Sequence, residues 1–195
     1  MIQKPANYDN AQAFTGEYER LTPGGHVCII KSARQETDRN GNPYLAIAFD
    51  IAQGDPQAGF FTRQYNAKKK QDTSAKWPVN GVYRQGLGEK SASYLKGMIT
   101  CIMESNPGYI WKWDEATLPG KLFGGVFGIE EYKGNDGKIR EAVKCRFIRS
   151  VEAVKAGIEA PEAKRLINNS NTPAEWSNPG YFPPDRSEID EYMPF

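Results

Sequence analysis

Residues 121–149 hold two strand-like runs around one tight turn, and this pattern constrains the fold of the whole chain. Asp136-Gly137 marks the turn, because both residues tolerate positive φ. The second run alternates in character. Its apolar side chains share one predicted face, and its basic side chains share the other: Ile139, Val143, Cys145 and Phe147 against Arg140, Lys144 and Arg146. The pattern predicts a hairpin with one apolar and one basic face.

Glycines crowd the first arm of this hairpin, at positions 120, 124, 125 and 128. Glycine weakens a plain strand and is typical of bulges, sharp bends or close backbone approach. A bent hairpin with a basic face suits a curled sheet that binds an anionic polymer. The same face also suits the solvated outside of an ordinary sheet, and the hairpin alone favours this second interpretation.

The rest of the chain predicts three more strands and one helix. Strands are expected at residues 26–34, 44–51 and 59–65, with Asn40-Gly41 as the turn between the first two. In the second of these, we expect Leu45, Ile47, Phe49 and Ile51 to point inward. Residues 91–104 predict a helix that Ser91 caps, with Leu95, Met98, Ile99 and Ile102 on its apolar face.

Three strands, a helix and two strands follow the order of an OB-fold, a five-stranded and partly open Greek-key barrel. We therefore predict a mainly β protein with this fold and with its helix between strands 3 and 4. The predicted organisation is a lead-in over 1–20, the barrel domain over 21–160, a polar and proline-rich linker over 161–184, and a disordered acidic tail over 185–195.

The charge distribution separates the two ends of this arrangement. The whole chain carries 25 basic and 24 acidic residues, which gives a net charge of +1. Residues 183–195 include four acids and one base, so the rest of the chain is mildly basic. The net charge of the whole chain indicates no particular partner, but a mildly basic body with an acidic end is an asymmetry that calls for an explanation.

Catalytic chemistry has little support in the residues. The chain has one histidine and three cysteines that are far apart, which excludes the usual zinc spacings and disulfide frameworks. No nucleophile elbow or complete phosphate loop is present. We expect a protein that is not an enzyme and that holds no metal and no cofactor. The sequence shows no signal peptide or run of 18 apolar residues, so we expect it to be soluble and cytoplasmic, with no membrane contact.

Binding to single-stranded nucleic acid needs only cations along a groove and aromatic faces on which bases stack. Residues of both kinds follow one another after residue 60. The predicted contacts are Phe61, Arg63, Tyr65, Lys68, Lys69, Lys70, Trp77, Tyr83 and Arg84, together with Arg140, Lys144 and Arg146 of the hairpin. The competing interpretation places each aromatic in the core; we expect Trp77 and Tyr83, in a polar connection, to be accessible.

The chain resembles the single-stranded DNA-binding proteins encoded by phages of Gram-positive bacteria. The resemblance lies in LTPGG at 21–25, FDIA at 49–52, WP at 77–78, SNPG at 105–108, GGVFG at 124–128, EEY at 130–132 and the acidic end. These blocks are mostly turns and glycines and mark a fold. The resemblance implies an OB-fold that coats single-stranded DNA during phage replication and recombination.

The end of the chain is similar to the tip of bacterial single-stranded DNA-binding proteins. It combines carboxylates with one aromatic anchor, which suits a hydrophobic pocket with a basic rim on a partner. The residues expected to bind replication or recombination proteins are Asp190, Glu191, Met193, Pro194 and Phe195. Arg186 dilutes the acidic charge, which weakens the expected interaction.

Two other functions compete with DNA binding: a structural β-protein of a phage, and a small nuclease or other recombination enzyme. A structural protein gives no reason for the Pro-Phe tip, and an enzyme would need a carboxylate or histidine cluster. The sequence leaves the oligomeric state open, a homo-oligomer included.

Overall fold

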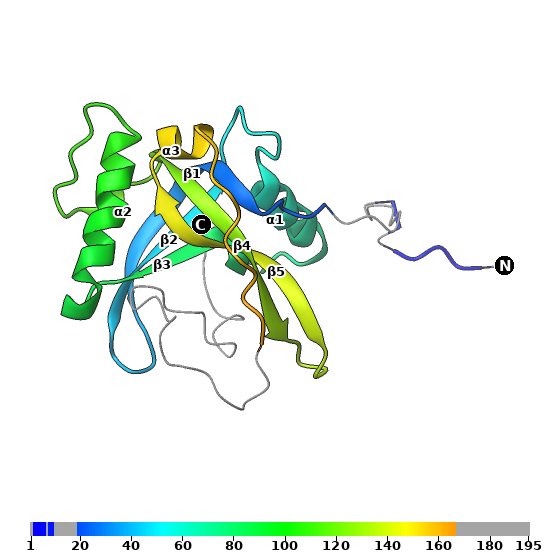
Figure 1. Cartoon of the computed structure of the whole chain (residues 1–195). Coiled ribbons are helices and arrows are strands. Elements are labelled where there is room, and N and C mark those ends of the chain that lie inside the picture. Colours follow the sequence, from blue (N-terminus) through cyan, green and yellow to red (C-terminus); the bar gives the residue numbers. More distant parts are fainter. Residues whose placement is uncertain (1, 7, 10–18, 167–195) are drawn as a thin grey trace.

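The computed structural model describes residues 2–6, 8, 9 and 19–166, and its elements are shown in Figure 1. The strands are β1 (Gly24–Thr37), β2 (Pro43–Ile51), β3 (Val82–Gly86), β4 (Leu122–Lys133) and β5 (Ile139–Arg149). The helices are α1 (Phe60–Gln71), α2 (Ala92–Glu104) and α3 (Val151–Lys155), and the 3₁₀ turns are η1 (Val79–Gly81), η2 (Glu89–Ser91) and η3 (Glu115–Thr117).

The five strands form one antiparallel sheet in the order β3-β2-β1-β4-β5. Both predicted hairpins are confirmed: Gly41 turns β1 into β2 with φ 81°, and Gly137 turns β4 into β5 with φ 79°. The sheet is strongly twisted, and η1, which leads into β3, contacts β5 at the opposite end of the strand order. The protein is therefore mainly β, with a helix between the third and fourth strands as predicted.

The core fills the inner face of this curled sheet. The ring of Phe49 on β2 lies 5.4 Å from that of Phe61, 5.5 Å from that of Phe123 and 6.0 Å from that of Phe127, measured between centroids. The predicted inward residues of β2 and the apolar face of α2 are all buried, as expected: Leu45, Ile47, Phe49, Ile51, Leu95, Met98, Ile99 and Ile102. Ser91 occupies the N-cap position of α2, but its side chain makes no capping hydrogen bond there.

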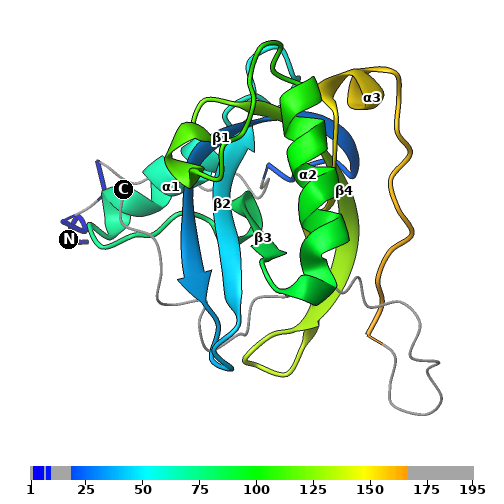
Figure 2. The same ribbon diagram turned by 90° about the vertical axis from the view of Figure 1, so that its left-hand side faces the viewer.

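The strand predicted at residues 59–65 is wrong, because this segment begins helix α1. The strand pattern came from Phe61, Arg63 and Tyr65 at alternate positions, yet Phe60 and Phe61 are both buried, which one turn of a helix allows. The third strand is instead β3, within the connection predicted to follow it. Figures 1 and 2 show α1 and α2 apart from each other on the curled sheet, and both contribute buried side chains to the same core.

The predicted faces of the second hairpin arm are wrong beyond residue 145, because β5 contains a β-bulge there. Cys145 pairs with Phe127 and Phe147 pairs with Val126, which leaves Arg146 as the extra residue. Beyond the bulge the phase of the strand changes, so that Ile148 rather than Phe147 is buried in the core. Val143 and Cys145 belong to the core side as predicted, whereas Ile139 at the start of the strand is 58% exposed.

The glycines of β4 allow α3 to approach the sheet closely. A Cβ atom at Gly124 would lie 2.5 Å from Val154 Cγ2 and 2.6 Å from the carbonyl oxygen of Ser150. Ser150 caps α3 by accepting a hydrogen bond from Ala153 N. The close backbone approach predicted from these glycines is thus what the structure contains. None of the helices in the described ranges is long and apolar enough to cross a membrane.

Two glycine-to-alanine substitutions test this packing in opposite directions. Gly124→Ala should lower the free energy of unfolding by about 1–3 kcal/mol, because the new methyl group overpacks the contact with α3. Gly97→Ala should raise it by about 0.5–1 kcal/mol, because this exposed position of α2 has open space around its Cα and alanine favours the helix. Urea unfolding curves measure both, and a neutral Gly124→Ala would contradict the close approach.

Candidate nucleic-acid interface

The outer sheet face is the surface of β1, β2 and β3 that points away from the core. Alternate residues of β2 lie on this side of the strand, among them Tyr44, Ala46 and Asp50, since Leu45 and Ile47 point to the other side. All three are themselves buried, with Tyr44 6% exposed. Ala46 pairs with Arg34 of β1 on one side and with Arg84 of β3 on the other. Two arginines therefore flank one small residue in the middle of this face.

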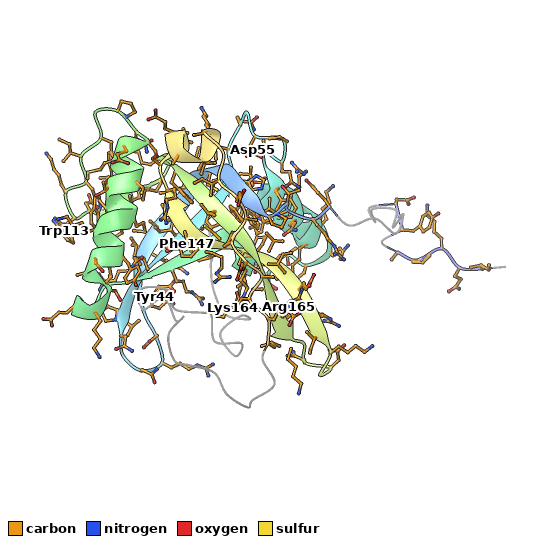
Figure 3. The ribbon with its side chains drawn as sticks, viewed as in Figure 1. Tyr44, Asp55, Trp113, Phe147, Lys164 and Arg165 are labelled. Carbon is orange, nitrogen blue, oxygen red and sulfur yellow. The ribbon has the colours of Figure 1, made fainter. Side chains whose placement is uncertain are left out.

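Arg84 and Tyr44 form a cation–aromatic pair on the outer sheet face (Tyr44 is labelled in Figure 3). The guanidinium carbon of Arg84 lies 5.6 Å from the centre of the Tyr44 ring. Its Nε atom is buried and has no hydrogen-bond partner. Within the described ranges, no carboxylate lies within ion-pair distance of Arg84, whereas Arg34 is paired with Glu36 at 2.5 Å. Arg84, a predicted contact, therefore carries a positive charge that no carboxylate of the described residues balances.

Helix α1 begins over this face because Asp50 holds its first turn. The buried carboxylate of Asp50 accepts hydrogen bonds from the backbone N–H of Phe61 at 2.8 Å and of Thr62 at 3.2 Å. It also accepts one from the hydroxyl of Thr62 and one from Ile51 N. These bonds satisfy N–H groups that a helix start leaves without partners. The cap comes from a neighbouring strand, so it ties α1 to the sheet.

The other end of α1 brings cations and an aromatic ring beside a hollow of about 590 Å³. We call this space the Tyr65–Trp77 hollow; its walls include Tyr65, Lys68, Asp72, Lys76, Trp77 and Pro78. The Lys69 ammonium lies 5.3 Å from the centre of the Tyr65 ring, whose centroid is 5.6 Å from that of Trp77. The one acid of this wall, Asp72, is engaged with Ser74, whose hydroxyl and backbone N–H lower the pKa of its carboxyl.

Three aromatic residues predicted to contact DNA belong to the core instead. Phe61 and Tyr83 are 1% and 5% exposed, and Trp77 is 6% exposed. Phe61 packs between Phe49 and Phe60, and Tyr83 faces inward because it pairs with Ile47. Trp77 was expected to be accessible, but its Nε1–H donates to the carbonyl of Gly81 at 3.1 Å and only its edge reaches the hollow.

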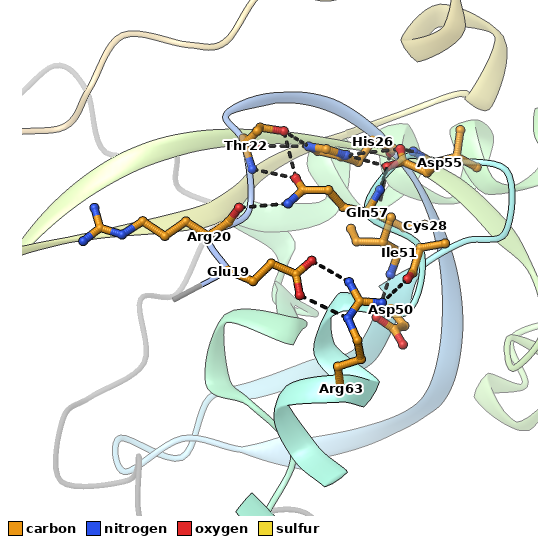
Figure 4. A network of polar contacts seen from close by, with 12 residues as sticks. Glu19, Arg20, Thr22, His26, Cys28, Asp50, Ile51, Asp55, Gln57 and Arg63 are labelled. Carbon is orange, nitrogen blue, oxygen red and sulfur yellow. Dashed lines mark hydrogen bonds and ion pairs between the residues drawn. The ribbon is translucent and has the colours of Figure 1, made fainter. Parts of the chain in front are cut away.

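Arg63 was predicted to share a face with Phe61 and Tyr65, and the helix separates them. Its guanidinium turns to Glu19 in the segment before β1, with Nη2–Oε1 at 2.5 Å and Nε–Oε2 at 3.1 Å (Figure 4). The hydrogen bonds that Arg63 donates to Glu19 raise the pKa of Arg63. Its charge is therefore already balanced by a carboxylate.

The three basic residues predicted to share one face of β5 do not form a row of unpaired charges, because two of them are paired with acids. Arg140 pairs with Asp136 at 2.8 Å, and Lys144 pairs with Glu130 at 2.9 Å. Glu130 also meets Lys164, which lies beside β4 together with Arg165 (Figure 3). Burial raises the pKa of Glu130, but Lys144 and Lys164 outweigh burial and hold this pKa below its ordinary value of 4.5. Arg146, the third member, sits at the bulge and separates from the other two.

The single histidine takes part in a buried network near the start of β1 (Figure 4). His26 Nδ1 lies 3.1 Å from both carboxylate oxygens of Asp55, and Nε2 lies 2.9 Å from the carbonyl oxygen of Thr22. Gln57 joins the same network by accepting from Thr22 N at 2.8 Å. The network fastens the chain before β1 to the turn after β2. Within residues 2–6, 8, 9 and 19–166, no three histidine, cysteine or acidic side chains are grouped to hold a metal.

The sequence predicted four residues that lie at these contacts: Tyr65, Lys68 and Lys69 at the Tyr65–Trp77 hollow, and Arg84 against Tyr44. It did not identify Tyr44. The signal was available: if Leu45 and Ile47 point inward, then Tyr44 points outward. The missing step was the pairing of β2 with β3, which sets Tyr44 beside Arg84. The predicted partner-binding residues, Asp190 to Phe195, lie outside the described residues.

Comparison of this chain with models of known protein families, and with curated proteins, finds no match.

The charge balance on β4 and β5 predicts a pH-dependent effect of Glu130→Gln. A carboxyl whose pKa is lowered by folding stabilises the protein above its unfolded pKa, and this contribution is lost as the pH falls through the folded pKa. Glu130→Gln should therefore lower the free energy of unfolding at pH 7, and the difference from wild type should shrink as the pH falls below about 4.5. Urea unfolding at pH 7 and pH 3 measures this. Glu141→Gln, at an exposed position of β5, serves as the control, and an equal effect of both substitutions would contradict the pairing.

Proposed function

We propose that this protein binds single-stranded DNA without catalysis and with little sequence preference. The observation that carries the proposal is the contact of Lys69 with the half-buried ring of Tyr65, and a second cation, Arg84, lies against Tyr44, whose own ring is buried and whose hydroxyl donates to Glu36. In both pairs, no carboxylate of the described residues lies within ion-pair distance of the cation. The second pair adjoins the Tyr65–Trp77 hollow, whose volume suits a group of nucleotide size.

A single strand needs what these pairs supply. Each base has an apolar face that can stack on an aromatic ring, worth about 1–3 kcal/mol, and each phosphate seeks a cation. Lys68, Lys69 and Lys70 are exposed at the end of α1, and none is engaged by a carboxylate of the described ranges. Stacking and phosphate contact place no demand on base identity, hence the weak sequence preference.

The strand arrangement supports an OB-fold as part of the proposal. A barrel opened between β3 and β5 would give the order β3-β2-β1-β4-β5, and the contact of η1 with β5 partly closes that gap. OB-folds bind oligonucleotides on the face of strands 2 and 3, beside the loops after strands 1 and 4. The outer sheet face corresponds to that location. Helix α1, inserted between β2 and β3, adds the lysines to it.

Titration with labelled oligo-dT and with duplex DNA at several salt concentrations tests the proposal. We expect much tighter binding of the single strand, and an affinity that falls steeply with salt. We expect a smaller slope of log K against log salt when glutamine replaces Lys68, Lys69 and Lys70 together. The slope should decrease in magnitude by up to about 2, because each phosphate contact on a single strand contributes about 0.7.

The matched control replaces Arg140 and Lys144, whose charges are paired with Asp136 and Glu130. This variant should keep nearly the wild-type salt dependence. Equal affinity for duplex, or no binding at low salt, would refute the proposal. A flatter salt dependence in the control variant alone would indicate that the DNA binds at Arg140 and Lys144 of β5 instead.

The acidic residues 185–195 supply the second part of the proposal, the recruitment of replication or recombination proteins in a phage-infected or prophage-carrying cell. Deleting residues 188–195 should leave single-strand affinity intact or slightly tighter at low salt, because an acidic tether competes with DNA for a basic surface. Phe195→Ala should remove most partner binding in a pull-down with candidate replication proteins, since the aromatic is the anchor. Lost DNA affinity in the deletion, or full partner binding by Phe195→Ala, would contradict this role.

A further inference from the structure

The bulge in β5 turns one aromatic side chain out of the core. Because Arg146 is inserted between the paired residues Cys145 and Phe147, the position that would have faced inward is taken by Ile148. Phe147 is half-buried and does not belong to the core cluster (Figure 3). Bulges often re-aim a side chain next to a functional site. Here the re-aimed side chain is a phenylalanine, which gains nothing from contact with water.

Two guanidinium groups accompany this ring. The guanidinium carbon of Arg149 lies 5.6 Å from the centre of the Phe147 ring, and that of Arg146 lies 6.0 Å from it. Both distances fall within the range of cation–π contact. Two positive charges therefore lie close to one ring, and their mutual repulsion is unfavourable unless an anion is nearby.

The structure provides no such anion among the residues it describes. Neither Arg146 nor Arg149 has a carboxylate of those residues within ion-pair distance, whereas Arg140 and Lys144 on the same strand are each paired. Arg149 donates only to the carbonyl of Ile148 at 3.1 Å, and Nη1 of Arg146 is buried without a hydrogen-bond partner. A buried donor without a partner costs free energy that a bound anion would recover.

We infer that Phe147, Arg146 and Arg149 form a second binding point for the DNA strand, separate from the Tyr65–Trp77 hollow. The ligand is one nucleotide unit: its base packs against the exposed part of the Phe147 ring, and its phosphate meets the two guanidinium groups. A free phosphate would use the arginines alone, whereas the ring requires a ligand with an apolar face. The inference rests on the proposed function, because it assigns to the same strand a second contact on β5.

The two binding points lie on opposite ends of the strand order. The first involves β2, β3 and α1, and the second involves β5, the other edge of the sheet. A short oligonucleotide that occupies the first point would leave the second empty, whereas a longer one would reach both. The site size of a single OB-fold, about 4–16 nucleotides, spans this difference.

Binding of full-length protein to an oligo-dT series from about 4 to about 20 nucleotides tests the inference. Phe147→Leu keeps an apolar side chain and removes the ring. This variant should bind long oligonucleotides about 5- to 150-fold more weakly, which corresponds to the loss of one stack, and should bind the shortest ones like wild type. Arg146→Gln with Arg149→Gln should act on the same long oligonucleotides and should also flatten the salt dependence by up to about 1.4.

Two controls separate the possible outcomes. Arg140→Ala, on the same strand but paired with Asp136, should bind every length like wild type, and thermal unfolding verifies that each variant is folded. If wild type fails to bind oligo-dT at any length, the proposed function is wrong. If wild type binds, and the folded Phe147→Leu and double arginine variants bind long oligonucleotides equally well, the second binding point is wrong. Equal weakening of the shortest and longest oligonucleotides would also overturn it, since both contacts would then belong to one point.

Discussion

The carboxylate of Asp50 connects the two parts of the candidate interface. It lies on the outer sheet face yet is only 2% exposed, because the first turn of α1 covers it and donates to it. A helix start needs acceptors for its free N–H groups, and here a strand supplies them rather than a residue of the helix itself. The position of α1 thus depends on the register of β2. This cap acts together with the buried rings of Phe60 and Phe61, and both hold the start of α1 against the end of β2.

Charge pairing, rather than the number of basic residues, distinguishes the surfaces of this protein. Strand β5 and its surroundings carry many cations, but Asp136, Glu130 and Glu131 neutralise Arg140, Lys144, Lys164 and Arg165. The exposed pair Arg140–Asp136 contributes little stability, whereas the carboxylate of Glu130 is buried; both acids remove their cations from competition for phosphates. Four of the cations without a carboxylate partner among the described residues, Arg84, Lys69, Arg146 and Arg149, each lie against an aromatic ring. That coincidence of free charge and aromatic surface is the basis for the proposed DNA contacts.

The sequence predicted most elements, because their signals are local. Alternation fixed β1, β2 and the two arms of the last hairpin, glycine turns fixed both hairpin loops, and spacing at three and four residues fixed α2. The errors arose where residues that are distant in the sequence determine the conformation of a segment or the burial of a side chain. Helix α1 depends on Asp50, eleven residues before Phe61, and the exchange of Phe147 for Ile148 depends on a bulge that only pairing with β4 defines. Trp77 and Tyr83 looked accessible because their neighbours are polar, but contacts with Gly81 and Ile47 place them inside.

Hydrogen exchange of the backbone amides, with and without a saturating oligo-dT, tests the central claim most directly. We expect slower exchange on DNA binding in two segments that surround the first contact, residues 64–79 and strand β3. We also expect unchanged exchange over residues 139–144, where the cations are paired with acids. Protection confined to residues 139–144, with none at 64–79, would contradict the assignment of the interface to the outer sheet face and α1.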